Sequence, residues 1–480
     1  EPFVSGMRVC SGRLMAPRTQ IPFLVLLMRL ALCAAERVAI IGGGIAGSSA
    51  AFFLRGQELS ITIFEAQHVG GRVLETEFPK SGPIMVEAGG AAIHSLNQYM
   101  AHFVETLGLH RDTSLKGVAG FAPNSVTGVS TWDGSRLTAF NPLAYPLSLL
   151  RARRMVSNVT QLWERIYELQ ARNVSFGHPR EMLEQLGVAE LAATSAREWM
   201  QGKLDPAFLR DFVDGVSRVN YGQDSSINAF ADAVSLAGAG LVGSLFSVRE
   251  GNSKVMEGLI NASGAKLHRA RVTAIRVGTE GYQVCIQDGS CESFASVIIA
   301  APLELASLDL DERIHPQSPP RAYQVTVATF VAASGLNPRY FRTPGAVNEG
   351  TIMTTANASI PFNSVAVHGV SGDRKVYKVF SSSALPDSLL RDIFVNASAE
   401  RQQFAWRAYP VLRPSGPWPP FRLHRGSHRG GVYYANAMES PVSCMETEAV
   451  AGKNVALLLA EDLRGEPPRP AASQPRSVVV

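Results

Sequence analysis

The sequence predicts an α/β protein in which a Rossmann-like dinucleotide-binding domain is interrupted by an inserted α+β domain. A glycine motif follows a short apolar run near the N-terminus, helical periodicity dominates from about residue 130 to 250, and strand signals return after residue 271. A chain of 480 residues is long enough for two interleaved domains.

The glycine motif lies within residues 37–65, between two apolar runs that predict buried strands. Gly42 permits a tight turn, Gly44 lets the backbone approach a pyrophosphate, and Gly47 lets the following helix pack close to the strand. The N-terminus of that helix offers free N–H groups and a partial positive charge to phosphates. The second run ends at Glu65, which is placed to accept hydrogen bonds from ribose hydroxyls.

This βαβ unit is compatible with either NAD or FAD, and the residues that follow it favour FAD. They form a GGRxxxT pattern and then an ExGG pattern, which together resemble the signature of FAD oxidases that pair a Rossmann-like domain with a substrate domain. Small residues let the backbone pass close to the flavin, and the arginine supplies fixed positive charge. The alternative is a plain loop with a surface arginine. The residues of the two patterns are Gly70, Gly71, Arg72, Thr76, Glu87, Gly89 and Gly90.

Composition and net charge limit the kinds of molecule that we expect this protein to bind. The net charge of +4 is small and no long basic block is present, so we expect no nucleic-acid partner. Apolar residues make up 46% of the chain and charged residues 18%, as in globular proteins. We predict no metal site.

The N-terminus has the layout of a secretory signal peptide. Arginines precede the apolar run 21–35, and Cys33 and Ala35 occupy the −3 and −1 positions of a cleavage site before Glu36. The run is 15 residues long, short of the ~20 that span a bilayer, so a retained membrane anchor is the minority alternative. Five glycosylation sequons support entry into the secretory pathway; they begin at Asn158, Asn173, Asn261, Asn357 and Asn396.

Two cysteines flank a predicted hairpin turn at Asp288-Gly289. A two-residue loop puts the sulfurs of Cys285 and Cys291 on opposite faces, whereas a three-residue loop pairs the two residues directly. The sequence does not fix the register.

The remaining elements follow from hydrophobic periodicity. Helices are predicted at 96–107, 151–170, 195–215 and 444–460. Strands are predicted at 271–277, 282–286, 296–300 and 430–435, with a β-rich passage from 323 to 380. The predicted organisation is a signal peptide (1–35), an FAD-binding domain in three parts (36–130, 251–310 and 425–464), a substrate domain in two parts (131–250 and 311–424) and a disordered tail (465–480).

Several segments outside the glycine motif are similar to those of the prenylcysteine oxidases, also called farnesylcysteine lyases. The resemblance covers roughly residues 37–462, and its most specific parts are Asn-Tyr-Gly-Gln at 220–223 and the Met-Glu helix after Cys444. The similar segments are 93–97, 218–223, 233–236, 408–410, 432–439 and 443–456.

The resemblance implies a lysosomal or vacuolar thioether oxidase with non-covalent FAD. Such an enzyme uses oxygen to convert farnesyl- or geranylgeranyl-cysteine to cysteine, an isoprenoid aldehyde and hydrogen peroxide, and houses a long apolar tail. Contact with a membrane surface and the oligomeric state stay open. The resemblance also implies further FAD contacts; they are Gly251, Asn252, Val272, Asn436 and Glu439.

No single catalytic base is evident. His94 follows the ExGG pattern and is a candidate for proton handling, although a hydrogen-bonded structural histidine is as good an interpretation. Tyr221 is a candidate for lining the substrate pocket, with a plain buried tyrosine as the alternative. The chain departs from the family at Arg249 and Glu250, where the family has an acid and a glycine, and we expect Glu250 to disturb the flavin if that loop approaches it.

Two other functions compete with this one. One is another FAD oxidase, acting on amines or desaturating an isoprenoid; a flavin tethered to Cys444 would favour it. The other is a non-enzymatic prenyl-binding protein on the same architecture, which the intact dinucleotide motifs and the secretory signal argue against.

Overall fold

The computed structural model describes residues 35–113, 128–348, 350–426 and 429–465. Residues 37 onward form one compact unit. Apart from Ala35 and Gly465, the predicted signal peptide and C-terminal tail lie outside the described residues.

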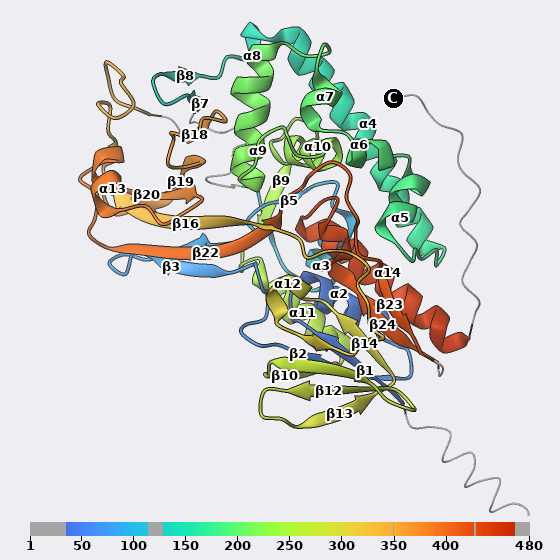
Figure 1. The fold of residues 1–480 in the computed structure, drawn as a ribbon. Coiled ribbons are helices and arrows are strands. Elements are labelled where there is room, and N and C mark those ends of the chain that lie inside the picture. Colours follow the sequence, from blue (N-terminus) through green and yellow to red (C-terminus); the bar gives the residue numbers. More distant parts are fainter. Residues whose placement is uncertain (1–34, 114–127, 349, 427–428, 466–480) are drawn as a thin grey trace, which may run out of the picture. The chain divides into compact units, whose positions relative to one another are not determined.

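A six-stranded sheet forms the core of the dinucleotide-binding part (Figure 1). The pairs β10–β2, β1–β14 and β14–β24 are parallel, and β23 adds an antiparallel edge. The carboxyl halves of β1 and β2 are fully buried, as expected for strands covered on both faces. In spatial order the strands are β10 (Lys266–His268), β2 (Leu59–Phe64), β1 (Glu36–Ile41), β14 (Ser296–Ile299), β24 (Gly431–Tyr434) and β23 (Arg422–Arg425).

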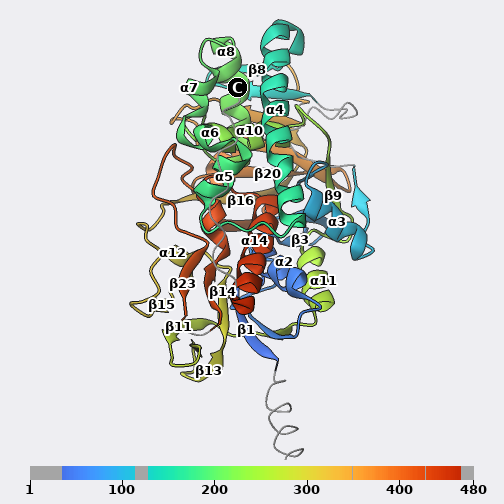
Figure 2. The ribbon, with the colours of Figure 1, turned by 90° about the vertical axis from the view of Figure 1, so that its right-hand side faces the viewer.

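Helix α2 (Ile45–Leu54) packs between α11 (Ser253–Ser263) and α14 (Met445–Arg464), as Figure 2 shows. The crossing with α14 is close, because a Cβ on Gly452 would lie 2.6 Å from the carbonyl oxygen of Ala46. Segments 400 residues apart in the sequence therefore lie side by side at the start of α2.

The strand predicted at 271–277 forms, as Val272–Val277, but it lies outside the parallel sheet. It is β11 of a four-stranded sheet, and the shorter β10 takes the edge of the parallel sheet instead. The hairpin has the three-residue loop of the two alternatives. Cys285 therefore lies opposite Cys291, and a disulfide joins them. The four strands in order are β13 (Cys291–Phe294), β12 (Tyr282–Ile286), β11 and β15 (Asp309–Leu310).

A seven-stranded, mostly antiparallel sheet forms the centre of the inserted part. Its order is β22 (Arg401–Pro410), β16 (Tyr323–Ala333), β20 (Arg374–Ser381), β19 (Ser364–Ser371), β18 (Thr351–Thr354), β7 (Val129–Trp132) and β8 (Leu137–Ala139). The shorter strands are β3 (Glu75–Phe78), β4 (Ile84–Glu87), β5 (Ile93–His94), β6 (Arg111–Asp112), β9 (Leu245–Val248), β17 (Gly335–Leu336) and β21 (Phe394–Val395).

The other helices are mostly those of the inserted part. Helix α10 packs on α4 and α9, and α9 reaches β18 of the large sheet. They are α3 (Gln98–Thr106), η1 (Pro142–Ala144), α4 (Pro146–Ala171), α5 (Pro179–Leu186), α6 (Ala189–Ala193), α7 (Ala196–Met200), α8 (Pro206–Phe208), η2 (Leu209–Val213), α9 (Asp214–Tyr221), α10 (Ala229–Gly238), α12 (Leu303–Ala306), α13 (Asp387–Ile393) and η3 (Ala435–Glu439).

The helical stretch predicted at 195–215 is broken. Helix α7 ends at Met200, and a new helical run begins at Pro206, where the side chain of Asp205 accepts the Ala207 N–H at 2.7 Å. Proline at the first helical position and aspartate before it make a strong start signal, which the periodicity concealed.

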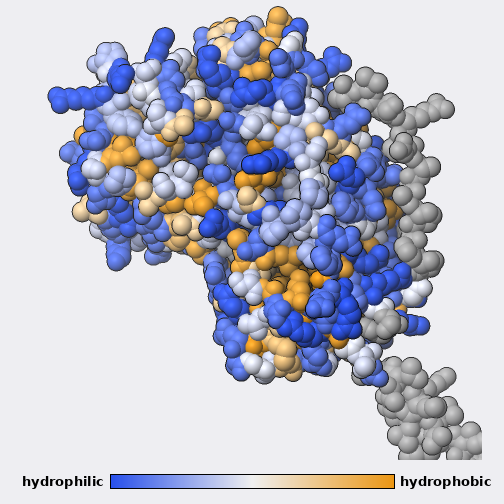
Figure 3. Space-filling model, viewed as in Figure 1, coloured by the Kyte–Doolittle hydropathy of each residue, from blue (hydrophilic) through white to orange (hydrophobic). Residues whose placement is uncertain are grey.

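Polar side chains cover most of the face shown in Figure 3, and apolar side chains gather in patches, the clearest in the lower part of the view. Among the described residues, no helix combines the length and the apolar character needed to cross a membrane.

Candidate functional site

The predicted glycines form a tight turn between β1 and α2. Gly42 has a φ of +113°, and a Cβ there would lie 2.5 Å from the carbonyl oxygen of Ala300. At Gly47 a Cβ would lie 2.0 Å from the carbonyl oxygen of Gly42. Only glycine fits at these two positions, so the chain itself requires them whether or not a ligand is bound.

Gly44 and Gly71 differ from these two because they face open space. A Cβ on Gly44 would have its nearest neighbour, the oxygen of Gly70, 3.9 Å away, and one on Gly71 would lie 3.6 Å from the Cα of Gly44. The two backbones therefore border a space that side chains would fill. We call Gly42–Gly47 together with Gly70 and Gly71 the cradle.

The N-terminus of α2, which follows the turn, is suited to binding an anion. Gly44 is the N-cap residue of α2, and no side chain caps the helix or places an acid in its first turn. Its first N–H groups and its partial positive charge point to the cradle.

Glu65 ends β2 beside the cradle. One carboxylate oxygen accepts the N–H of Gly43 at 2.7 Å, and the other accepts that of Gln67 at 2.7 Å. The carboxylate is 9% exposed. Each oxygen keeps a second lone pair, so the group is oriented by the backbone and still able to accept ribose hydroxyls.

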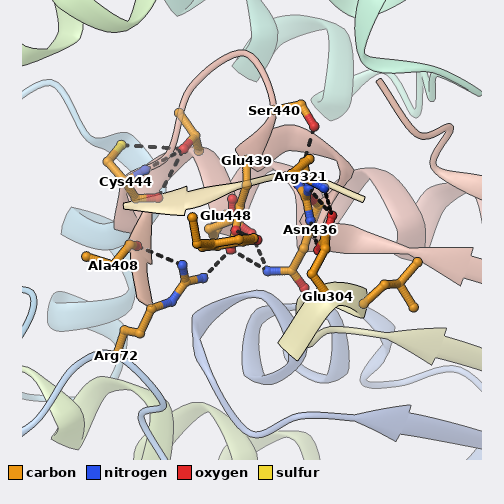
Figure 4. A network of polar contacts seen from close by, with 12 residues as sticks. Arg72, Glu304, Arg321, Ala408, Asn436, Glu439, Ser440, Cys444 and Glu448 are labelled. Atoms are coloured by element: carbon orange, nitrogen blue, oxygen red, sulfur yellow. Dashed lines mark hydrogen bonds and ion pairs between the residues drawn. The ribbon is translucent and has the colours of Figure 1, made fainter. Parts of the chain in front are cut away.

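Arg72 leaves the cradle and enters a buried polar network (Figure 4). It forms an ion pair with Glu439 of η3 and donates to the carbonyl oxygen of Ala408 at 2.9 Å. Glu439 also accepts from Asn436, at 2.6 Å, and from the hydroxyl of Tyr323, at 2.7 Å. Burial alone would raise the pKa of Glu439, but the nearby arginine charges and these hydrogen bonds hold it below its usual value.

A second arginine supports the far side of this network. Arg321, 10% exposed, pairs with Glu304 at 2.7 Å and donates to the carbonyl oxygen of Asn436 at 2.8 Å and to the hydroxyl of Tyr434. It ties η3 to the start of α12 and to the chain that enters β16. The guanidinium N–H groups of Arg321 thereby hold these three segments in fixed positions relative to one another.

Glu448 lies in the same network, in the first turn of α14. It is 4% exposed, and one of its oxygens accepts from Asn436 at 3.3 Å. The other oxygen has no hydrogen-bond partner among the described residues. Burial, and then the neighbouring carboxylate of Glu439, raise the pKa of Glu448 well above its ordinary value.

The ExGG loop is held by the turn before α11. Asn252 donates to the carbonyl oxygens of Gly90 and Ala91 at 2.9 Å each, and its N–H donates to Glu87 at 3.2 Å. A Cβ on Gly89 would lie 2.1 Å from the carbonyl oxygen of Arg72, so that glycine allows the loop to pass close behind the cradle.

Glu87 and Glu75 form a half-buried pair of acids. Glu87 is opposite Glu75 across β3 and β4, and burial followed by the charge of Glu75 raises the pKa of Glu87 to about 8. The ammonium of Lys378 donates to the carbonyl oxygen of Glu87 at 3.0 Å. These contacts indicate a hydrogen-bonding role for Glu87.

Glu250 lies outside the cradle, and its carboxylate is engaged by a neighbouring residue on the surface. Its carboxylate lies 2.6 Å from Nδ1 of His110, which holds the pKa of Glu250 low, at about 2. The positive φ of this turn, +103°, falls on Gly251 instead. Arg249 likewise donates its N–H to the carbonyl oxygen of His110.

A pair of tyrosines lies next to the network. The rings of Tyr221 and Tyr409 meet edge to face with their centroids 4.9 Å apart, and Tyr221 is 3% exposed. Gln223 clamps this region by donating to the carbonyl oxygen of Pro410 at 3.1 Å. The residue before Tyr409 is the one whose carbonyl Arg72 contacts, so a single arginine joins the cradle to the tyrosine pair.

Cys444 lies in the same neighbourhood, as the N-cap residue of α14. Burial raises the pKa of its thiol, and the hydroxyl of Thr447 donates to the sulfur at 3.6 Å. A neutral thiol is a poor nucleophile, which favours non-covalent over tethered flavin.

His94 has both ring nitrogens engaged by the backbone. Nε2 lies 2.6 Å from the carbonyl oxygen of Val242, and Nδ1 accepts the N–H of Leu96 at 3.1 Å. Burial lowers the pKa of the ring. In this geometry His94 fixes the loop before α3 and has no nitrogen free for a substrate.

Two groups contain most of the predicted cofactor residues: the cradle with Glu65, and the network that runs from Arg72 to η3. Val272 begins β11, where it is buried and offers only its backbone. Local sequence patterns did not indicate the polar and aromatic residues that complete the network, the tyrosine pair and the contacts of Glu87. They are Glu304, Arg321, Tyr323, Lys378, Tyr409 and Glu448.

The residues present fit an FAD. The cradle has room that only glycines leave, the uncapped α2 offers N–H groups to a pyrophosphate, and Glu65 is oriented for a ribose. Where such a group binds, it supplies a two-electron oxidant.

Comparison with known proteins supports the same assignment. Residues 133–468 match the family model described as prenylcysteine lyase, and residues 40–107 match that of an NAD(P)-binding Rossmann-like domain. Cyclohexylamine oxidase from Brevibacterium oxydans shares the fold, with a TM-score of 0.57 and 16% identity over 90% of this chain and all of that one.

Curated relatives extend over most of the chain. Prenylcysteine oxidase 1 of Bos taurus is 32% identical, covering 88% of this chain and 88% of its own. Farnesylcysteine lyase of Arabidopsis thaliana is 30% identical, covering 88% of this chain and 87% of its own. The chain therefore belongs to the prenylcysteine lyase family.

Proposed function

We propose that this chain is an FAD-dependent oxidase that cleaves the thioether of a prenylcysteine, such as farnesyl- or geranylgeranyl-cysteine. The reaction consumes the thioether, oxygen and water, and yields cysteine, an isoprenoid aldehyde and hydrogen peroxide. The observation that carries the proposal is the bond from Arg72 to the carbonyl of Ala408, which joins the cradle to the tyrosine pair in segments typical of the family.

The protein's own contribution is positioning rather than proton transfer. Sulfur and the adjacent double bond stabilise the positive charge that develops on the allylic carbon, so no strong base is needed. Tyr221 and Tyr409 offer ring faces and edges to an apolar chain. The Arg321 and Glu439 contacts fix η3, and with it the wall of the site.

The deciding experiment incubates the FAD-loaded protein with farnesylcysteine and follows oxygen uptake, peroxide and aldehyde. We expect the three in equal amounts, and none from a prenylated peptide. Cyclohexylamine serves as the rival substrate. Peroxide from the amine but not from the thioether would refute the proposal in favour of an amine oxidase, and binding of farnesylcysteine without peroxide would favour a prenyl-binding protein.

A matched pair of variants tests the cradle. Gly44 and Gly335 both have ordinary φ values and room for a methyl group. Gly44→Ala should leave the apo protein as stable as Gly335→Ala does, but should weaken FAD binding roughly 10- to 100-fold, since the methyl occupies space that a pyrophosphate needs. Equal FAD affinity in both variants would contradict this cofactor position.

We further propose that the protein acts in the lysosome or vacuole after entering the secretory pathway. The exposed sequon asparagines Asn158, Asn173, Asn261 and Asn396 and the Cys285–Cys291 disulfide support this. Asn357 is the weakest acceptor, because its amide donates to the carbonyl oxygen of Asp133 at 2.9 Å. Release of glycans by a glycosidase, read as a mass shift, tests the route; an unglycosylated cytosolic protein would refute it.

A further inference from the structure

The short helix η1 and the N-terminal end of α4 expose leucines where a helix of a water-soluble domain normally carries polar residues. Leu143 is 86% exposed, Leu147 65% and Leu150 66%. In Figure 3, apolar side chains lie at the top of the view, where α4 begins in Figure 1. These three leucines are called the leucine patch below.

The patch is not a continuation of the helix's inner face. On that face Ala152, Val156 and Val159 are buried against the core. Leu147 and Leu150 lie on the opposite face, where the helix further along exposes polar residues such as Asn158. The apolar character of the outer face is thus confined to the first two turns.

Positive charge follows the leucine patch along α4, and one acid of a neighbouring segment, Asp205, lies beside Ser148 in the first turn. Between residues 141 and 163 the sequence has three arginines and no acid. Arg153 and Arg154 are exposed, and so is Arg151, which donates to the carbonyl oxygen of Lys203 at 2.9 Å. Long arginine side chains beside exposed leucines are typical of a surface that lies in the interface of an anionic bilayer, with the leucines below the headgroups and the guanidinium groups among them.

We propose that the leucine patch and its arginines dock the protein on an anionic membrane surface. A second copy of this chain is the weaker alternative, because a symmetric contact through the patch would bring Arg153 and Arg154 of one copy next to those of the other. An anionic lipid surface satisfies both the apolar and the charged part of the patch.

Co-flotation of the full chain with vesicles tests the proposal. The vesicles are phosphatidylcholine alone or with phosphatidylserine, and a triple variant, Leu143→Ser, Leu147→Ser and Leu150→Ser, is compared with wild type. We expect wild type to bind the anionic vesicles and the triple variant to bind at least roughly tenfold more weakly. Met85→Ser with Val370→Ser removes two leucine-sized exposed side chains elsewhere, 61% and 59% exposed, and should change nothing.

A charge variant, Arg153→Gln with Arg154→Gln, should lower binding to anionic vesicles by roughly fivefold per arginine and leave binding to neutral vesicles unchanged. All four proteins carry the same N-terminal apolar segment, so differences among them report on the patch. Thermal melting checks that each is folded. Equal vesicle binding by wild type and the triple variant would overturn the proposal. So would a concentration-dependent dimer that the leucine substitutions abolish without any vesicle binding.

Discussion

Glu448→Gln should stabilise the protein at neutral pH and not at acid pH. The carboxyl group is 4% exposed and lies beside Glu439, and one oxygen has no partner among the described residues. Its pKa is therefore raised in the folded state, while in the unfolded chain it returns to an ordinary value near 4.5. The folded protein keeps a proton that the unfolded chain releases.

The direction and magnitude of the stability change follow from the difference between the folded and unfolded pKa of Glu448. Between the unfolded pKa and the folded one, stability falls as pH rises, by about 1.4 kcal/mol per unit of pKa difference. Glutamine has nearly the same shape and does not titrate. The variant should thus gain about 1–3 kcal/mol over wild type at pH 8 and less than about 0.5 kcal/mol at pH 5.

Urea unfolding of the apo protein at pH 5 and pH 8 measures this gain. Glu87 and Asp232 also have raised pKa values, but they are present in both proteins and cancel in the comparison. Glu168→Gln, at an exposed position of α4, is the matched control and should show no pH-dependent gain. An equal gain at both pH values would refute the reasoning. Lower stability of the variant at pH 8 would show that Arg72 and Arg321 hold the carboxylate ionised.

Two further substitutions test the packing around the site. Gly452→Ala should cost about 1–3 kcal/mol in urea unfolding, because its Cβ would lie 2.3 Å from the hydroxyl of Ser49 and 2.6 Å from the carbonyl of Ala46; an unchanged midpoint would contradict the close helix crossing. Arg321→Met should cost about 3–5 kcal/mol, because it leaves the carboxylate of Glu304 buried without its partner. A loss below about 1 kcal/mol would mean that the Arg321 pair is not buried in solution.

The sequence predicted the cradle because its signals are local. The turn, the helix start and the acid at the end of β2 fall within about 30 residues, and Gly42 and Gly47 meet steric demands that the structure shows. The long C-terminal helix and four strands of the parallel sheet, β1, β2, β14 and β24, were likewise predicted from their apolar patterns, whereas β10 and β23 were not. The domain boundaries stay predictions.

The polar network could not be predicted in the same way. Arg72 and Glu439 are 367 residues apart, and Arg321 lies between them in a stretch with no helical or strand periodicity. A pairing of this kind depends on the fold bringing three segments together. The sheet to which β11 belongs was not predicted for a related reason: an apolar run predicts a strand but not its neighbours.

Two acids show that the sequence alone did not indicate which carboxyl group lies in the buried network. From the sequence, we expected Glu250 to disturb the flavin if its loop approaches it, yet its carboxylate contacts His110 on the surface. Glu448 was not predicted to be a site residue, yet it lies one turn before Gly452. Gly452 packs on Ala46 in the first turn of α2. The charge of Arg72, which directly follows the cradle residue Gly71, acts on Glu448. An ionised carboxylate there would weaken the positive potential available to an anionic cofactor, whereas a protonated one would not. The same raised pKa that lowers stability at high pH therefore keeps the cradle compatible with an anionic cofactor, and FAD affinity should fall with rising pH in wild type but not in Glu448→Gln.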